Sequence, residues 1–60
     1  MNINQEKIGK FIKTERKKKN LTQEELASIL EVTDKAVSKW ENGRCLPDVS
    51  LFTKLCKALD

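Results

Sequence analysis

Apolar residues recur along this chain at the three- and four-residue spacing of amphipathic helices. They fall in four short segments separated by polar residues and turn formers, which predicts helices over residues 4–19, 23–30, 34–42 and 48–59. A chain of 60 residues buries only about 60% of the surface that its unfolded form exposes, so its core must be small. We therefore expect an all-α fold, a compact bundle of four short helices that forms one domain over residues 1–60.

Each predicted helix contributes one apolar face to this core. Trp40 is expected to be buried rather than to form part of a binding surface. Cys56 lies at helical spacing among apolar residues, so core packing is its expected role, whereas Cys45 lies in a loop. The predicted core consists of Ile8, Phe11, Ile12, Leu21, Leu26, Ala27, Ile29, Leu30, Val32, Ala36, Val37, Trp40, Leu46, Leu51, Phe52, Leu55, Cys56 and Leu59.

Residues at the predicted helix starts are of the types that cap helices. Thr22 and Glu25 have the spacing of a capping box, in which each side chain accepts a hydrogen bond from the other residue's backbone N–H. Asn20 suits the left-handed turn that ends a helix. The remaining helix starts are expected to be capped by Asn2 or Asn4, by Thr33 and by Asp48.

Positive charge is concentrated in the first third of the chain. The formal net charge is +3, and the residues before position 21 include seven lysines and arginines against two glutamates. A basic surface of this kind suits a polyanion such as a nucleic acid. A surface that only keeps the protein in solution would have the same composition, so charge alone leaves both interpretations open.

The composition argues against catalysis, metal binding and membrane insertion. The chain has no His and no Tyr, its two cysteines do not form a CxxC pair, and its two glycines do not form a phosphate-binding loop. We expect neither an enzyme nor a bound cofactor or metal ion. No apolar run approaches the roughly 20 residues that a membrane span needs. The first residues, MNINQEK, lack the apolar core of a signal peptide, so we expect a cytoplasmic protein.

The segment from Thr22 to Gly43 carries the most specific signal in the chain. It reads as two short helices joined by a tight turn, with the runs LTQEELA and DKAVSKWENG followed by RCLPD. These runs resemble the helix-turn-helix of the phage lambda repressor and Cro family, the XRE-type bacterial regulators. The resemblance extends from about Ile8 to Leu59 and is strongest in SKWENG.

This resemblance implies a regulator that binds double-stranded DNA in a sequence-specific manner, as a homodimer on an inverted repeat, with helix 34–42 in the major groove. The residues that would face base edges are Asp34, Lys35, Ser38 and Lys39. The residues that would contact backbone phosphates are Gln23, Thr33, Asn42 and Arg44. The family also has a structural ion pair that ties the first helix to the end of the third, and its positions here are Arg16 and Glu41.

Three features depart from the family pattern. Glu31 stands where family members usually have Gly in a left-handed turn, which costs on the order of 1 kcal/mol. Glu15 stands where Leu is common. The usual fifth helix, which often contributes to dimerisation, is expected to be absent, so the chain is either a shortened form of a longer protein or an unusually small regulator.

Two other interpretations of these residues remain. Without the motif, Lys35 and Lys39 are simply a solvated helix face. A protein-interaction module, antitoxin-like or acting as a co-regulator, would instead show an exposed apolar patch. A structure that shielded the lysines of the third helix behind other helices would remove the DNA-binding interpretation.

Overall fold

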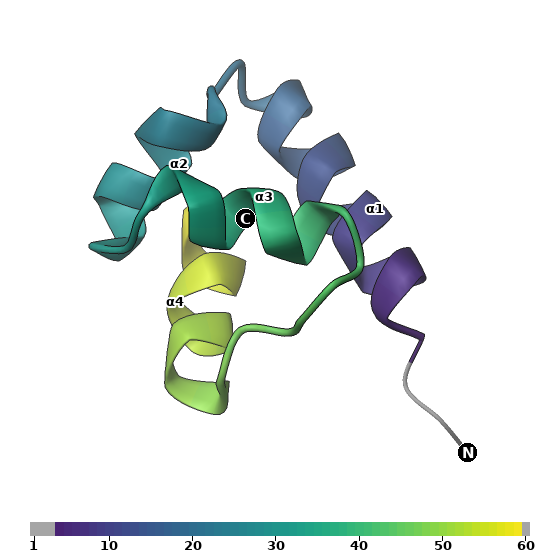
Figure 1. Cartoon of the computed structure of the whole chain (residues 1–60). Coiled ribbons are helices and arrows are strands. Elements are labelled where there is room, and N and C mark those ends of the chain that lie inside the picture. Colours follow the sequence, from purple (N-terminus) through teal and green to yellow (C-terminus); the bar gives the residue numbers. More distant parts are fainter. Residues whose placement is uncertain (1–3, 60) are drawn as a thin grey trace.

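A computed structural model of the chain describes residues 4–59, which contain four α-helices and no strand. Figure 1 shows α3 lying across the front of the molecule, where it contacts both α1 and α2, while α4 packs on α2 and α1. The predicted all-α bundle of four short helices is therefore confirmed. The helices are α1 (Gln5–Lys18), α2 (Gln23–Leu30), α3 (Asp34–Glu41) and α4 (Val49–Leu59).

The observed helix ends lie one residue inside the predicted ones at both ends of α1, at the end of α3 and at the start of α4. At these positions the residue just outside the helix has non-helical backbone angles or caps the helix. The spacing of apolar residues does not distinguish such a residue from the helix itself. Asn4 is the cap of α1, and its side chain accepts the N–H of Lys7 at 3.1 Å. The other proposed cap of this helix, Asn2, lies outside the described residues.

The predicted caps of α2 and α3 are confirmed. The Thr22 hydroxyl accepts the N–H of Glu25 at 3.0 Å, and the Glu25 carboxylate accepts the N–H of Thr22 at 2.9 Å. The Thr33 hydroxyl accepts the N–H of Ala36 at 3.2 Å. These bonds satisfy backbone donors that the first turn of a helix leaves unpaired, so the two helices on either side of the turn begin at fixed residues.

Asp48 caps α4, as predicted. One of its carboxylate oxygens accepts the N–H of Leu51 and the hydroxyl of Ser50, each at 2.9 Å. The hydrogen bond from Leu51, followed by that from Ser50, lowers the pKa of Asp48 below its ordinary value. The cap therefore contributes to stability in full above the unfolded-state pKa, and this contribution is lost as the pH falls through the lowered folded-state pKa.

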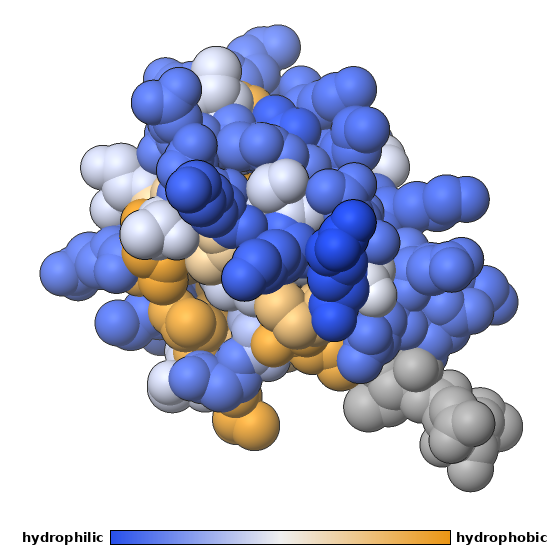
Figure 2. All heavy atoms as spheres, in the orientation of Figure 1, coloured by the Kyte–Doolittle hydropathy of each residue, from blue (hydrophilic) through white to orange (hydrophobic). Residues whose placement is uncertain are grey.

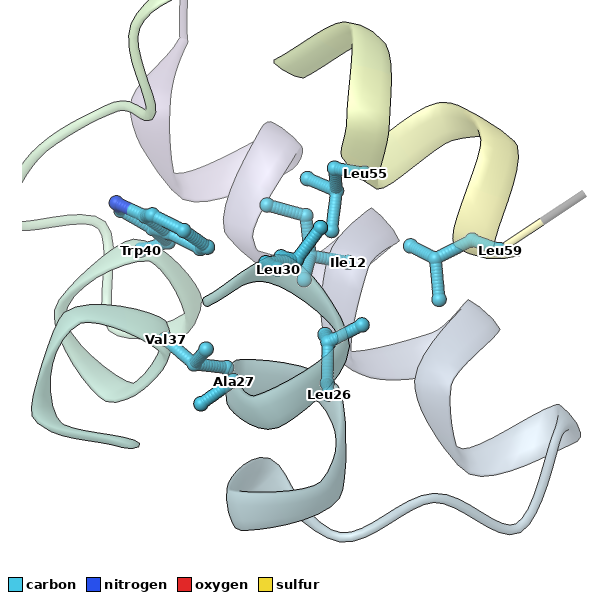
Figure 3. Close-up of a cluster of buried hydrophobic side chains, with 8 residues drawn as sticks. All are labelled: Ile12, Leu26, Ala27, Leu30, Val37, Trp40, Leu55 and Leu59. Carbon is cyan, nitrogen blue, oxygen red and sulfur yellow. The ribbon is translucent and has the colours of Figure 1, made fainter. Parts of the chain in front are cut away.

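Eight side chains from all four helices form the buried core shown in Figure 3. Leu26, Leu30 and Leu55 lie at its centre and are no more than 1% exposed. Trp40 is 4% exposed, which confirms that it is a core residue. The full set is Ile12, Leu26, Ala27, Leu30, Val37, Trp40, Leu55 and Leu59.

Four residues predicted for the core are exposed instead. Phe11 and Ile29 are 52% and 55% exposed, Phe52 is 39% exposed, and Cys56 also lies on the surface. Each belongs to a helix face that is two apolar residues wide, and only the neighbouring residue of the pair packs against another helix. The prediction that Cys56 packs in the core is therefore wrong, because helical spacing gives the direction of an apolar face but not how far its neighbours extend over it.

Gly9 allows α1 to cross α3 at very short range. A Cβ atom at this position would overlap the backbone oxygen of Trp40, and would lie 2.8 Å from the backbone oxygen of Glu41. Both atoms belong to the rigid end of α3, so neither can move aside without moving the helix. The absence of a side chain at residue 9 thus sets the distance between α1 and the helix that carries the candidate binding residues.

Glu31 ends α2 in the left-handed conformation that was predicted for it, with φ 58° and ψ 41°. We expect Glu31→Gly to be neutral or to raise the free energy of unfolding by up to about 1 kcal/mol, because glycine adopts this conformation without strain. Urea unfolding measures the difference. Glu24→Gly is the matched control, since it removes the same charge from a helical position and should cost about 0.5–1 kcal/mol. A clear loss of stability in Glu31→Gly would contradict the expectation that Glu31 is strained in the left-handed conformation.

Among the described residues, none of the helices is long and apolar enough to cross a membrane.

Candidate nucleic-acid interface

The outward side of α3 is polar and open to solvent, while its inward side is anchored in the core. Val37 is fully buried and fixes the rotation of the helix together with Trp40. Lys35 and Lys39 are exposed, so the shielding by other helices that would have excluded DNA binding is not observed. Figure 2 shows mainly hydrophilic side chains over α3.

The four predicted base-contacting residues lie on this one helix, within two turns. Asp34 is exposed at the start of α3, followed by Lys35 and Lys39 on the outward side. Ser38 is half-buried, and its hydroxyl accepts a hydrogen bond from the side-chain amide of Asn42 at 3.3 Å. This contact joins a predicted base-contacting residue to a predicted phosphate-contacting one, and their four-residue spacing, at which side chains on a helix meet, is its one signal in the sequence.

Three of the predicted phosphate-contacting residues flank α3. Thr33 precedes the helix, and its hydroxyl keeps a free hydrogen to donate, since the cap uses only its oxygen. Asn42 follows the helix and is exposed. Arg44 is also exposed, and its backbone N–H donates to the Lys39 carbonyl at 2.9 Å, which holds it against the last turn of α3. Gly43, with φ 72°, makes this reversal of the chain possible.

The ion pair predicted between Arg16 and Glu41 is present and buried. The Arg16 Nε donates to one carboxylate oxygen at 2.7 Å and Nη2 donates to the other at 3.1 Å, and the two side chains are 9% and 3% exposed. The remaining Nη1 donates to the Leu21 carbonyl at 2.7 Å. Arg16 thus connects α1 to the end of α3 and to the segment that leads into α2.

Gln23, the fourth predicted phosphate-contacting residue, joins this pair. Its side-chain Nε2 donates to Glu41 Oε1 at 3.0 Å, across 18 positions of sequence. Sequence reasoning missed this contact, because no local spacing relates the start of α2 to the end of α3. As a result α1, α2 and α3 meet at a single carboxylate.

Two of the exposed apolar residues, Val49 and Phe52, lie together away from the outward side of α3. A groove between the start of α1 and the start of α4 is lined mainly by apolar side chains, and Val49 at its edge is 84% exposed. Figure 2 shows hydrophobic side chains below α3, over α4 and the loop that leads into it. We call this the apolar groove, and its lining residues are Ile8, Leu46, Pro47, Val49, Phe52 and Thr53.

No group of three or more His, Cys, Asp or Glu residues in the described part of the chain could hold a metal ion. Cys45 is half-buried and Cys56 is exposed, and both are free thiols.

A family model described as helix-turn-helix matches residues 12–60 of the chain, which include α2, α3, the turn between them and α4. The chain belongs to the XRE-type helix-turn-helix family. This membership supports a role in DNA binding and transcription regulation.

Similarity to individual proteins is consistent with membership of this family. Multiprotein-bridging factor 1 of Candida albicans is 38% identical over 52 residues, which are 87% of this chain and 34% of that protein. Two structures of the clp gene regulator ClgR from Corynebacterium glutamicum match 97% of this chain with a TM-score of 0.88 and 29% identity. This helix-turn-helix chain spans about a third of the length of the first relative, and 62% and 74% of the two ClgR chains.

Proposed function

We propose that this chain is a domain of a transcription regulator that binds double-stranded DNA in a sequence-specific manner, with α3 in the major groove. The observation that carries the proposal is the outward side of α3, where Lys35 and Lys39 are exposed on a helix whose inward residues are fixed in the core. Membership of the family and the likeness to the regulator ClgR support it. We also propose a cytoplasmic protein with no catalytic activity of its own.

The chemistry of α3 fits the pattern of donors and acceptors in the major groove. This groove is about 12 Å wide, admits one α-helix and shows a distinct pattern for each base pair. In our proposal Lys35 and Lys39 donate to guanine O6 and N7, and Asp34 accepts from the amino group of cytosine. Ser38 is short and its hydroxyl both donates and accepts, so it fits several bases at close range.

The residues around α3 would fix its position by binding the phosphate backbone. Gln23 begins α2, Thr33 precedes α3, and Asn42 and Arg44 follow it, so in our proposal phosphate contacts surround the reading helix. Contacts of this kind set the register of the protein on the duplex without selecting a sequence. The positive field of the exposed lysines before position 21 would speed the encounter with DNA.

Selection of bound duplexes from a random pool, read at two salt concentrations, tests the function. We expect a consensus that persists at the higher salt, because direct contacts to bases depend less on salt than contacts to phosphates do. We also expect the consensus to be an inverted repeat with half-sites about one helical turn apart, bound by a homodimer. A single asymmetric half-site would contradict the dimer, and no enrichment at either salt would contradict sequence-specific binding.

Lys39→Ala is expected to weaken binding to the selected site by about 1–3 kcal/mol and to relax the preference at one base position. The change removes one exposed donor from the outward side of α3 and leaves its buried face intact. Titration of fluorescent duplexes that differ at single positions measures both effects. Lys57→Ala is the matched control, since it removes the same charge from an exposed position on α4. Equal losses for the two variants on every duplex would remove Lys39 from base recognition.

A protein-interaction module is the second candidate function, and one observation favours it. Such a module would need an exposed apolar patch, and the apolar groove supplies one below α3 that no residue of α3 lines. The name of the relative from Candida albicans indicates a protein that bridges others. Val49→Ser would weaken capture of a protein partner in this case but leave binding to DNA unchanged, which separates the two functions.

A further inference from the structure

The Glu41 carboxylate accepts one hydrogen bond beyond the two that pair it with Arg16. Its carboxylate is already neutralised by the two bonds from Arg16 to its two oxygens. The third bond, from the side-chain amide of Gln23, neutralises nothing further and lies at the edge of the buried network, where Gln23 is half-buried and accessible from the start of α2. This asymmetry indicates that Glu41 acts on Gln23 rather than the reverse.

A carboxylate selects one orientation of a neighbouring amide. A glutamine side chain carries an oxygen that accepts and a nitrogen with two donors, whereas an ionised carboxylate only accepts. Glu41 therefore holds the nitrogen of the Gln23 amide on its side and uses one of its two N–H groups at 3.0 Å. Among the described residues the other N–H has no partner, so it remains available to an anion.

The same helix start offers further donors. The capping box uses the N–H of Glu25, and the first helical hydrogen bond of α2 runs from Leu26 to the Thr22 carbonyl. The N–H groups of Gln23 and Glu24 lie before these and are left without intrahelical partners, as at any helix start. A phosphate that approached the Gln23 amide would meet these donors and the positive end of the helix dipole.

We propose that Glu41 is a positioning residue for DNA binding. It presents the Gln23 amide to a backbone phosphate, while Arg16 neutralises the negative charge of the Glu41 carboxylate. This proposal rests on the proposed function, and it adds that the buried network of Arg16 and Glu41 serves binding as well as folding. A glutamine that rotated freely would offer its oxygen to the phosphate as readily as its nitrogen. Fixing it in advance removes that unproductive orientation.

A mutant cycle tests the proposal by replacing the whole ion pair. Arg16→Met with Glu41→Met removes one positive and one negative charge, so the long-range attraction to DNA is unchanged. Exchange of a buried pair for apolar side chains is often tolerated by a fold, whereas removal of one partner is not. Affinity for one selected duplex is measured for the wild type, the pair exchange, Gln23→Ala, and the combination of all three changes, with folding verified by circular dichroism.

We expect Gln23→Ala to weaken binding about tenfold, as for loss of a charge-assisted hydrogen bond, and the pair exchange to weaken it several-fold. The pair exchange should then have no further effect in the Gln23→Ala background. An equal loss in both backgrounds, or none in either, would overturn the positioning role. If Gln23→Ala itself binds like the wild type, the phosphate contact is wrong and the inference fails with it. If the wild type selects no duplex, the proposed function fails instead.

The wild-type protein provides a second test that does not depend on a variant folding. The chain has two glutamines, and Gln5 is exposed at the start of α1 and makes no side-chain hydrogen bond among the described residues. Relaxation of the side-chain ¹⁵N groups in the free protein should show the Gln23 amide to be rigid on the picosecond-to-nanosecond scale and the Gln5 amide to be mobile. Equal mobility of the two amides would contradict a Gln23 side chain that is fixed before DNA binds.

Discussion

Arg16→Ala is expected to unfold much of the protein at 37 °C. The change leaves the Glu41 carboxylate, whose side chain is 3% exposed, without its charged partner. Loss of one member of a buried pair costs about 3–5 kcal/mol, and a domain of this size has a total stability of only about 3–9 kcal/mol. The Leu21 carbonyl also loses its donor. Thermal unfolding followed by circular dichroism should show a melting temperature lower by about 12 °C or more.

Lys13→Ala is the control for this variant. Lys13 is exposed on the same helix and its side chain makes no hydrogen bond or ion pair among the described residues, so its loss should change stability by no more than about 0.5 kcal/mol. Similar melting temperatures for the two alanine variants would mean that water solvates the Arg16–Glu41 pair in solution.

Gly9→Ala is the second variant with a large expected effect, and it acts by steric overlap alone. The new methyl group would overlap the backbone at Trp40 and Glu41, so α1 and α3 would have to separate. Alanine is the better helix former by about 1 kcal/mol, but overpacking against backbone costs about 1–3 kcal/mol or more. We expect a net loss of roughly 1–2 kcal/mol in urea unfolding, from these two opposing contributions, and weaker DNA binding from a displaced α3.

Thr14→Ala separates the steric effect from helix propensity. Thr14 is exposed on α1, so an alanine there should be neutral or slightly stabilising. If Gly9→Ala were also neutral, the two helices would not cross as closely as the structure shows.

The sequence was sufficient for those parts of the fold that depend on local chemistry. The capping box at Thr22 and the caps Thr33 and Asp48 all involve residues within three positions of one another. Their geometry follows from the residue types themselves. The burial of Trp40 followed from a single apolar face on a helix of two turns.

The parts that could not be predicted depend on residues far apart in the chain. Exposure of Ile29 and Cys56 depends on where neighbouring helices end, which apolar spacing does not encode. Gly9 gave no signal at all, because its role is set by the backbone of α3, some 30 positions later. The Arg16–Glu41 pair was accessible only through family resemblance, and the hydrogen bond that adds Gln23 to it required the structure.

The candidate interface could likewise be predicted only in part from the sequence. The pattern of the third helix predicted which residues face outward, and the exposure of Lys35 and Lys39 agrees with it. Which bases the two lysines would meet, if the proposal holds, depends on the DNA, and the helix itself does not encode it.

Dimethyl sulfate protection on a selected duplex tests the central proposal most directly, because this reagent methylates guanine N7 in the major groove and adenine N3 in the minor groove. We expect the wild type to protect guanine N7 within each half-site, since Lys35 and Lys39 are proposed to donate there. Lys39→Ala should lose protection at one guanine per half-site and keep the rest. Protection confined to adenine N3, or an unchanged N7 pattern when both lysines are replaced by alanine, would contradict recognition of bases by α3.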